Sequence, residues 1–321
     1  MQNNIPKIVV LDGNAVNPGD ISWAPISSKG DFTLYPRSTQ AQAIERARDA
    51  DIVINNKVKL DEHVLSQLPN LKYIGLLSTG YDVVDIEYAK SKGIVVCNVP
   101  AYSSRSVAQL TIALLLELVM NVGGHSQSVH QGDWSKCPDF CYWLGDIIEL
   151  DGKTIGLVGY GSIARYVAVI ARSLGMRVLA YNRSGVVDEN AEFSPLDRLL
   201  AESDIVSLHC PLNNDSRQMI DSTALSKMKV GSYLINTARG GLVVEKDVVD
   251  ALDSGKLAGY ASDVLAQEPP QADNLLAGHP KAVITPHIAW ASVSARERLL
   301  AVASQNIKSF LAGSPINQVN K

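Results

Sequence analysis

The chain has 321 residues, of which 46% are hydrophobic and 19% are charged, and its formal net charge is −4. This mild acidity gives no reason to expect nucleic acid or an anionic membrane surface as a partner. The length suggests two domains, each large enough to bury its own core.

Targeting signals are not expected in this sequence. The first residues, MQNNIPKIVVLDG, enter a strand-like run without the basic and apolar regions of a signal peptide. The longest apolar run, LTIALLLELVM (residues 110–120), is too short to span a bilayer and contains Glu117, so we expect a buried helix. A cytoplasmic location is the resulting expectation.

The chain contains four cysteines: Cys97, Cys137, Cys141 and Cys210. They lack the paired CxxC spacing of a zinc or thioredoxin site, so no metal centre is expected. Cys137 and Cys141 are close enough in sequence for a disulfide, but free thiols in a reducing cytoplasm are the favoured interpretation.

The first part of the chain alternates short strand-like runs with helical segments. The expected elements are, in order, strand 7–13, helix 39–50, strand 51–56, helix 61–70, strand 73–80 and strand 94–100. Near-continuous apolar strands separated by helices indicate a parallel sheet that is covered on both faces.

The second part repeats this pattern. Its expected elements are strand 153–161, a helix, strand 177–182, helix 196–204, strand 205–212, strand 232–240, helix 248–256, strand 259–265 and strand 282–289. Two such sets predict two doubly wound α/β domains. A last helix is expected over 292–313, with Ser294 and Glu297 at capping-box spacing. Residues 123–150 are the least periodic, and we interpret them as the connection between the domains.

The segment TIGLVGYGSIARYVAV (residues 154–169) joins a strand to a helix through a glycine-rich turn. Gly159 permits a tight turn, and Gly161 lets the backbone approach a pyrophosphate at the helix N-terminus. Ala164 stands where a third glycine usually packs helix against strand, and alanine is accepted there. The context predicts a dinucleotide site, with a plain glycine-rich turn as the alternative.

The residues after the next strand bear on which dinucleotide binds. NAD sites usually place Asp or Glu here, because a carboxylate accepts hydrogen bonds from both ribose hydroxyls. This chain has Asn182, followed by Arg183 and Ser184. Asn182 does not repel a 2′-phosphate, and the other two can bind it. We expect NADPH to be accepted, with its preference over NADH left open; alternatively, Arg183 is a solvated loop cation.

Three later strands end in ionisable residues: INTARGG contains Arg239, SDVLAQEP contains Glu268, and ITPHIAW contains His287. Ligands of open α/β sheets bind at the carboxyl ends of strands, so the three side chains are expected to share one crevice. A guanidinium suits a carboxylate, an imidazole can exchange a proton near neutrality, and a carboxylate orients that imidazole. This set suits a dehydrogenase of 2-oxo or 2-hydroxy acids. Singly, each residue could instead be a cap, a surface acid or a satisfied polar group.

The motifs NTARGGLVVEKDVVDAL, DVLAQEP and PHIAW resemble the D-isomer-specific 2-hydroxyacid dehydrogenase family, and the resemblance covers essentially the whole chain. It implies Arg239, Glu268 and His287 as the catalytic set. The segment STGYDVVD resembles the family's carboxylate-binding loop. The substrate would accordingly be bound by Ser78, Thr79, Gly80, Arg239 and His287.

The resemblance also implies a nicotinamide pocket behind the glycine-rich turn. The complete expected cofactor site for NAD or NADP comprises Gly159, Gly161, Ser162, Ile163, Asn182, Arg183, Ser184, Cys210, Pro211, Thr237, Ala238 and Asp263.

In this family the substrate domain is split by the dinucleotide domain. The resemblance therefore implies a discontinuous, flavodoxin-like substrate domain (1–100 and 290–321) and an inserted Rossmann domain (101–289). The helix beginning near residue 103 implies a homodimer with much of its contact in the inserted domain. Trp143 is expected either to reach the partner's site or to pack between domains.

Within the family, DFCYWLGDIIELDGKTIG and PHIAWAS look most like glycerate dehydrogenases (hydroxypyruvate reductases). That implies reduction of hydroxypyruvate or glyoxylate to the D-2-hydroxy acid. A D-lactate-type or other D-2-hydroxyacid dehydrogenase is the alternative within the family. Glu268 disfavours formate dehydrogenases, which have glutamine there, and the end at Lys321 disfavours the longer phosphoglycerate dehydrogenases. A dinucleotide-sensing corepressor is the non-enzyme alternative, and a methyltransferase leaves Arg239 and His287 unexplained.

Overall fold

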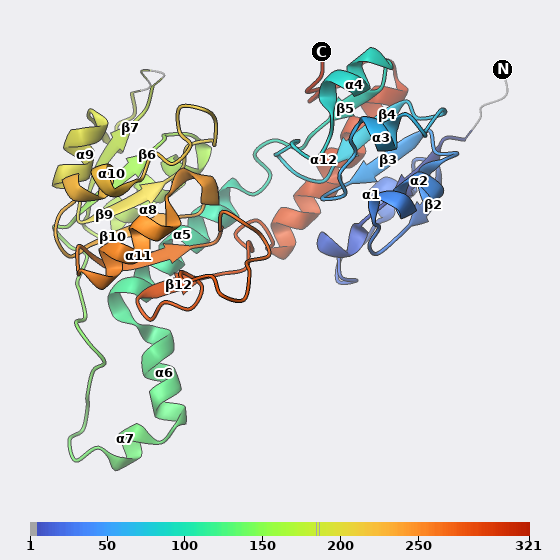
Figure 1. Cartoon of the computed structure of the whole chain (residues 1–321). Helices are drawn as coiled ribbons and strands as arrows, with labels where there is room; N and C mark the ends of the chain where they lie inside the picture. The colour runs from blue at the N-terminus through green and yellow to red at the C-terminus, as the bar shows by residue number, and fades with distance from the viewer. Residues whose placement is uncertain (1–4, 184, 186) are drawn as a thin grey trace. The chain divides into compact units, whose positions relative to one another are not determined.

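The computed structural model describes residues 5–183, 185 and 187–321. The chain divides into two compact units, which are described separately here (Figure 1). Unit 1 contains Met1–Ser103 and Ala291–Lys321, and unit 2 contains Ser104–Trp290. The bounds of unit 2 differ from the expected 101–289 by three residues at the start and one at the end.

Unit 1 is built on a parallel five-stranded sheet in the order β2-β1-β3-β4-β5. Its strands are β1 (Lys7–Val10), β2 (Asp31–Leu34), β3 (Ile52–Asn55), β4 (Tyr73–Leu76) and β5 (Val95–Cys97). The flavodoxin-like order 2-1-3-4-5 confirms the expected fold class. Strand β2 was not predicted, because this edge strand exposes most of its side chains and has no apolar run.

Helices α1 (Ala24–Ser27), α2 (Gln40–Ala47), α3 (Glu62–Leu65), α4 (Ile86–Ser91) and α12 (Val293–Leu311) complete unit 1, with a 3₁₀ turn at Gly13–Ala15. The predicted cap of α12 at Ser294 is wrong. The N-cap is Ser292, whose hydroxyl accepts from the Ala295 N–H, because the chain is already helical at Val293. The Phe310 ring of α12 lies 4.7 Å from the Tyr73 ring of β4, so the last helix completes the core of unit 1.

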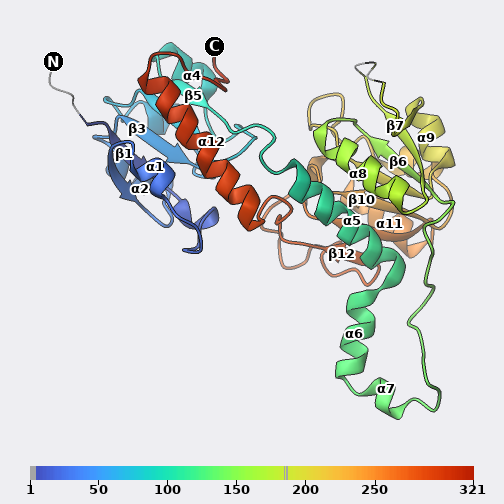
Figure 2. The same ribbon diagram turned by 180° about the vertical axis from the view of Figure 1, so that it is seen from behind.

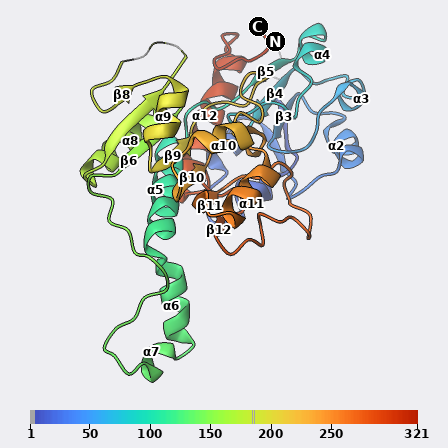
Figure 3. The same ribbon diagram turned by 60° about the vertical axis from the view of Figure 1, so that its left-hand side comes forward.

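Unit 2 is built on a parallel seven-stranded sheet in the order β12-β11-β10-β9-β6-β7-β8 (Figure 3). Its strands are β6 (Thr154–Val158), β7 (Arg177–Tyr181), β8 (Glu192–Phe193), β9 (Ile205–Leu208), β10 (Ser232–Asn236), β11 (Leu257–Ser262) and β12 (Ala282–Ile284). Strand order reverses between β6 and β9, which is where a doubly wound sheet of the Rossmann type binds its ligand. All strands are parallel, so all their carboxyl ends lie along one edge.

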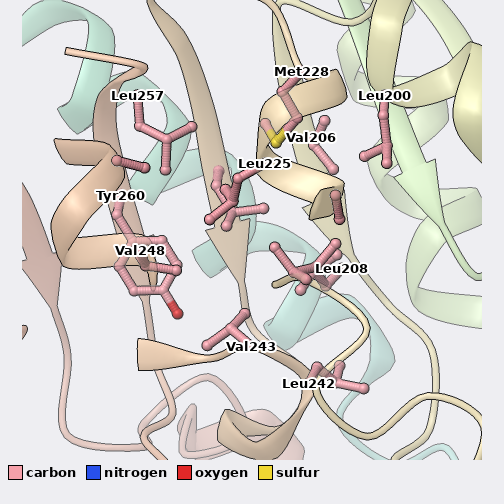
Figure 4. Packing of buried hydrophobic residues seen from close by; sticks show 14 of the residues in the cluster. Leu200, Val206, Leu208, Leu225, Met228, Leu242, Val243, Val248, Leu257 and Tyr260 are labelled. Atoms are coloured by element: carbon pink, nitrogen blue, oxygen red, sulfur yellow. The ribbon is translucent and has the colours of Figure 1, made fainter. Parts of the chain in front are cut away.

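Helices cover both faces of this sheet: α5 (Ser104–Met120), α8 (Ser162–Ser173), α9 (Leu196–Glu202), α10 (Ser222–Lys227) and α11 (Glu245–Asp253). Neighbouring strand residues belong to different cores. Leu234 packs with α9, α10 and α11, whereas Ile235 packs with α5 and α8. Figure 4 shows the first of these cores, including Leu225 of α10 and Val248 of α11. Two-sided burial explains why these strands read as continuous apolar runs.

The apolar run forms a helix as predicted, but α5 buries only eight of its 17 residues. Among the residues that the structure describes, no single helix is long and apolar enough to cross a membrane. Only α5 with α6 (Val122–His130) meets that length and composition, and the pair is bent by 61°.

The interpretation of residues 123–150 as a domain connection is wrong. This segment belongs to unit 2, and the chain passes between the units after Ser103 and after Trp290. Residues 121–149, called the arm below, contain α6 and α7 (Asp133–Lys136) and extend from the end of α5 away from the sheet (Figure 2). The arm lacks periodicity because most of its apolar side chains pack against no core, although Ile148 packs beside the α5–α8 core. It exposes Val122, Val129, Trp134, Phe140, Trp143, Leu144 and Ile147.

Candidate active site

The glycine-rich turn follows β6 and has the geometry of a dinucleotide cradle. Gly159 has φ +89°, and a Cβ there would lie 2.7 Å from the Cys210 nitrogen, so no larger residue fits. Gly161 caps α8, and a Cβ there would have no neighbour within 4 Å. Ala164 is fully buried against the sheet. A helix N-terminus with open space before it fits the pyrophosphate of a dinucleotide.

The first residues of α8 contribute mainly through their backbone. The Ser162 hydroxyl lies 2.9 Å from the Ser104 hydroxyl, and the Ile163 side chain packs beside the α5–α8 core. The backbone N–H groups at the start of the helix therefore remain as the groups aimed toward a ligand.

The expected ribose site begins directly after β7. Asn182 and Arg183 follow the strand, whereas Ser184 lies outside the described residues. Nη1 of Arg183 lies 2.5 Å from Oδ2 of Asp215, and both side chains are exposed. Asp215 is held in a tight turn, because Asn213 Oδ1 accepts from its N–H at 3.0 Å. The structure thus adds a carboxylate beside Arg183 that sequence reasoning missed.

Four of the expected nicotinamide-pocket residues lie at the ends of β9 and β10. Cys210 and Pro211 follow β9, and the Cys210 backbone packs against Gly159. Burial raises the pKa of the Cys210 thiol, so the group is a neutral thiol. Thr237 is buried, its hydroxyl 2.8 Å from that of Thr111 in α5, and the Ala238 N–H donates to Asn236 Oδ1 at 3.1 Å.

Arg239 follows β10 and is exposed at the same edge of the sheet. Its Nη1 donates to the Ala238 carbonyl at 2.7 Å. The next residue, Gly240, is in contact with the segment that leads to Glu268, because a Cβ there would lie 2.0 Å from the Leu265 carbonyl carbon. The close approach explains why glycine follows the arginine in this motif.

Glu268 and His287, which are 19 residues apart in sequence, are in direct contact. Glu268 Oε2 lies 2.5 Å from His287 Nδ1, and Oε1 accepts from the Leu265 N–H at 3.0 Å. An ionised carboxylate can only accept, so Nδ1 carries a proton in either charge state of the ring. Nε2 is then the atom that exchanges a proton. The side chains are 35% and 31% exposed, which leaves the ring within reach of a ligand.

Asp263 is buried and holds the turn that carries His287. Its carboxylate accepts from the Thr285 hydroxyl at 2.6 Å and from the Ile288 and Ala289 N–H groups, both at 2.8 Å. His287 itself has φ +56°, a strained value for a residue with a side chain. Sequence reasoning assigned Asp263 to the cofactor, but its two oxygens are engaged in fixing this turn.

The expected substrate loop, Ser78–Gly80, follows β4 in unit 1. The Thr79 hydroxyl donates to the Val99 carbonyl at 2.8 Å, and the Thr79 carbonyl accepts from Asn98 Nδ2 at 2.7 Å. Within the described part of the chain, the three backbone N–H groups of the loop donate to no other group. Three consecutive donors of this kind suit a carboxylate.

In the ranges 5–183, 185 and 187–321, no three His, Cys, Asp or Glu residues are grouped as a metal site would require. Cys137 and Cys141 are both free thiols, and the Cys137 Sγ lies 4.0 Å from the Cys141 carbonyl oxygen.

The glycine cradle and the Glu268–His287 pair both lie within a segment that matches a known family. Residues 112–289 match the model of the D-isomer specific 2-hydroxyacid dehydrogenase, NAD binding domain. The chain belongs to this family. Its sequence identifies it as a D-2-hydroxyacid dehydrogenase, and its two parallel sheets agree with that assignment.

Several relatives are similar over nearly the full chain. A hydroxypyruvate reductase of Blautia hydrogenotrophica is 46% identical over 98% of this chain and 100% of the relative. A glycerate dehydrogenase of Methylorubrum extorquens is 40% identical over 98% of each chain. Among solved structures, an acyclic imino acid reductase in complex with NADPH and D-arginine is 32% identical, with a TM-score of 0.84 over 98% of this chain and 99% of that one.

Proposed function

We propose that this D-2-hydroxyacid dehydrogenase reduces a small 2-oxo acid, hydroxypyruvate or glyoxylate, to the D-2-hydroxy acid. The observation that carries the proposal is the contact between Glu268 and His287 at the carboxyl edge of the dinucleotide-binding sheet. The names of the relatives at 46% and 40% identity support the choice of substrate.

The cofactor would be held by the N-terminus of α8, by Asn182 and Arg183 at the ribose, and by the residues after β9 and β10. When bound, reduced nicotinamide supplies a hydride. The side chains of this protein carry out the proton transfer. Nε2 of His287 gives its proton to the carbonyl oxygen as the carbonyl carbon is reduced. Nδ1 keeps its own proton, which it donates in the hydrogen bond to Glu268. The exposed ring then regains a proton from solvent.

The remaining groups bind and orient the substrate. The Glu268 carboxylate accepts from His287 Nδ1 and so orients the ring with Nε2 available as the acid. The Arg239 guanidinium pairs with the substrate carboxylate and polarises the neighbouring carbonyl. The N–H groups of Ser78, Thr79 and Gly80 would bind the carboxylate as hydrogen-bond donors.

We further propose that NADPH is accepted. Asn182 places no charge at the ribose, and Arg183 offers a cation to a 2′-phosphate. A relative solved with NADPH supports this choice. Asp215 opposes it, because its carboxylate already pairs with Arg183 and would repel a phosphate. Calorimetric titration with NADPH and NADH tests the proposal, and strong discrimination against NADPH would overturn it.

We also propose that the enzyme is a homodimer that uses the arm. Exposed apolar side chains occur on the arm and also on two helices of unit 2, with Leu116 and Met120 on α5 and Tyr166, Val169 and Ile170 on α8. Large apolar side chains that gather on a protein surface are typical of a subunit interface, so we assign these residues to one. Sedimentation equilibrium should give twice the mass of the chain, and a monomer at micromolar concentration would contradict the proposal.

The central experiment measures initial rates of hydroxypyruvate reduction with NADH and with NADPH, and then repeats them with glyoxylate and pyruvate. Fast turnover of hydroxypyruvate supports the proposed function. Rates that increase with longer apolar 2-oxo acids would favour a D-lactate-type enzyme. No turnover of any 2-oxo acid by folded, cofactor-binding protein would remove the proposal.

A further inference from the structure

Asp12 is a buried carboxylate at the carboxyl edge of the sheet in unit 1. It follows β1 and is 7% exposed. Its Oδ1 accepts from the Asn56 N–H at 2.8 Å, and its Oδ2 accepts from the Lys57 N–H at 2.6 Å. These bonds join the end of β1 to the turn after β3, 44 residues later. Burial raises the pKa of Asp12 despite these bonds, so folding destabilises the charged form of this carboxyl group.

The turn after β3 in turn holds the residue that precedes the substrate loop. Asn56 is buried, and its Nδ2 donates to the Leu77 carbonyl at 2.6 Å. The Leu77 N–H donates to the Asn55 carbonyl at 2.8 Å, so the backbone of Leu77 is fixed on both sides. Ser78 is the next residue. Asp12 and the substrate loop are therefore connected through one side chain.

The other side of the substrate loop is fixed by the residues after β5. The Val99 N–H donates to the Ser78 carbonyl at 2.9 Å, and the bonds of Thr79 to Val99 and Asn98 complete that side. The loop is thus held between two segments; the Ser78 and Thr79 carbonyl groups accept from one of them, and the Gly80 carbonyl accepts from the Ser78 hydroxyl. This leaves the N–H groups of Ser78, Thr79 and Gly80 as the groups presented to a ligand.

We propose that Asp12 is a positioning residue for the substrate carboxylate: through Asn56 and Leu77 it holds Ser78–Gly80 in the arrangement that binds the anion. This inference rests on the proposed reduction of a 2-oxo acid. A preorganised set of N–H donors binds an anion well only if the donors do not have to be reordered on binding. The groups that transfer the proton belong to unit 2, so the effect of Asp12 should be on substrate binding.

Asp12→Asn tests this with little change in volume. An amide has one acceptor oxygen, so its NH₂ group must face either the Asn56 or the Lys57 N–H and leave that donor unpaired. We expect KM for hydroxypyruvate to rise about 10-fold or more, with kcat within about 3-fold of wild type. The dissociation constant of NADH, measured by fluorescence titration, should not change, because the cofactor residues are in unit 2.

Asp51→Asn is the matched control. Asp51 precedes β3, at the opposite edge of the same sheet, where it accepts from the Lys7 N–H at 3.0 Å and from Lys72 Nζ at 2.8 Å. The substitution makes the same chemical change in the same unit without touching the turn after β3. We expect KM to remain at its wild-type value, even if the melting temperature falls.

Asn56→Ala provides a second route if Asp12→Asn does not fold. It removes the bond to the Leu77 carbonyl and leaves both backbone bonds of Asp12 in place. It should also raise KM, and the double variant should raise KM by less than the product of the two single effects, because both act through one connection. If the two effects on KM multiply in the double variant, Asp12 and Asn56 do not act through one connection.

The outcomes separate the inference from the proposed function. A raised KM in Asp12→Asn and Asn56→Ala, but not in Asp51→Asn, supports the inference. An active wild-type enzyme with unchanged KM in both test variants, or with the same rise in Asp51→Asn, overturns the inference alone. A wild-type enzyme that reduces no 2-oxo acid removes the proposed function, and this inference with it.

Discussion

The carboxyl edges of the two sheets carry different kinds of chemistry. The edge in unit 1 presents backbone N–H groups, and the buried carboxylate of Asp12 there accepts from backbone N–H groups. The edge in unit 2 presents the side chains of Arg239, Glu268 and His287 on partly or fully exposed turns. Binding an anion requires only fixed dipoles, whereas transferring a proton requires a titratable group that solvent can reach. We therefore expect substitutions of Glu268 and His287 to change kcat and those at Asp12 and Asn56 to change KM.

Each edge also buries an ionisable group, and burial shifts the pKa values of the two groups in opposite directions. Burial raises the pKa of Asp12 from its ordinary 3.8, so its charged form is destabilised by folding. Burial lowers the pKa of His209, which follows β9, from 6.5 to about 4, so this ring stays neutral. In both cases desolvation is the dominant cause.

The largest expected effect concerns the proton donor of unit 2. His287→Asn should lower kcat for hydroxypyruvate by about 10²- to 10⁴-fold, the usual contribution of a general acid. NADH binding should be retained, because the residue acts on the substrate. Steady-state rates and a fluorescence titration check this, and a variant with more than about a tenth of wild-type kcat would contradict the assigned role.

The packing of the turn after Arg239 gives the next largest effect. Gly240→Ala would place a methyl group 2.0 Å from the Leu265 carbonyl carbon, so the backbone must shift. We expect a loss of about 1–3 kcal/mol in the free energy of unfolding, together with lower activity. Gly161→Ala is the comparison, because its Cβ has no neighbour within 4 Å. It should melt at the wild-type temperature and bind NADH more weakly. Equal melting temperatures for the two variants would show that the Leu265 contact is not tight.

The buried imidazole of unit 2 predicts a specific pH dependence of stability. Between pH 6.5 and about 4 the unfolded chain binds a proton at His209 that the folded chain does not, so stability falls as pH falls through this window. His209→Gln should therefore lose less in melting temperature than wild type when the pH is lowered from about 7.5 to about 5. Parallel thermal melts at the two pH values test this. An equal loss in both proteins would mean that His209 does not contribute.

The smallest expected effect concerns the ribose end of the cofactor site. Asp215→Asn removes the carboxylate that pairs with Arg183 and should tighten NADPH binding by about 2- to 5-fold, the range expected of an exposed ion pair. NADH binding should change less. Asp197→Asn makes the same charge change at the exposed ion pair between Asp197 of α9 and Lys227 of α10, and it should alter neither affinity. An unchanged ratio of the two dissociation constants in Asp215→Asn would show that Arg183 does not bind the 2′-phosphate.

Sequence patterns predicted the elements that bury both faces and the side chains that end them. Strands such as β3 and β10 read as apolar runs because every residue in them is buried. The two-residue β8 and the exposed β2 gave no such run and were missed. The arm was misassigned as a connection because an exposed segment and a linker look alike in composition.

The candidate site was likewise only partly predictable from the sequence. The contact between Glu268 and His287 could be anticipated, because both residues end neighbouring strands of one parallel sheet. Asp12 and Asp215 could not, because their partners lie 44 and 32 residues away in turns whose shapes depend on side-chain hydrogen bonds. Such turns leave no periodic signal in a single sequence.

The most direct test of this account measures kcat and KM for hydroxypyruvate in Glu268→Gln and Asp12→Asn side by side. Glu268→Gln replaces the carboxylate that orients the His287 ring, and the account predicts that kcat falls by about 100-fold with a smaller change in KM. Asp12→Asn should show the reverse, a raised KM with kcat nearly preserved. If both variants change the same parameter to the same extent, the two edges do not divide binding and proton transfer between them.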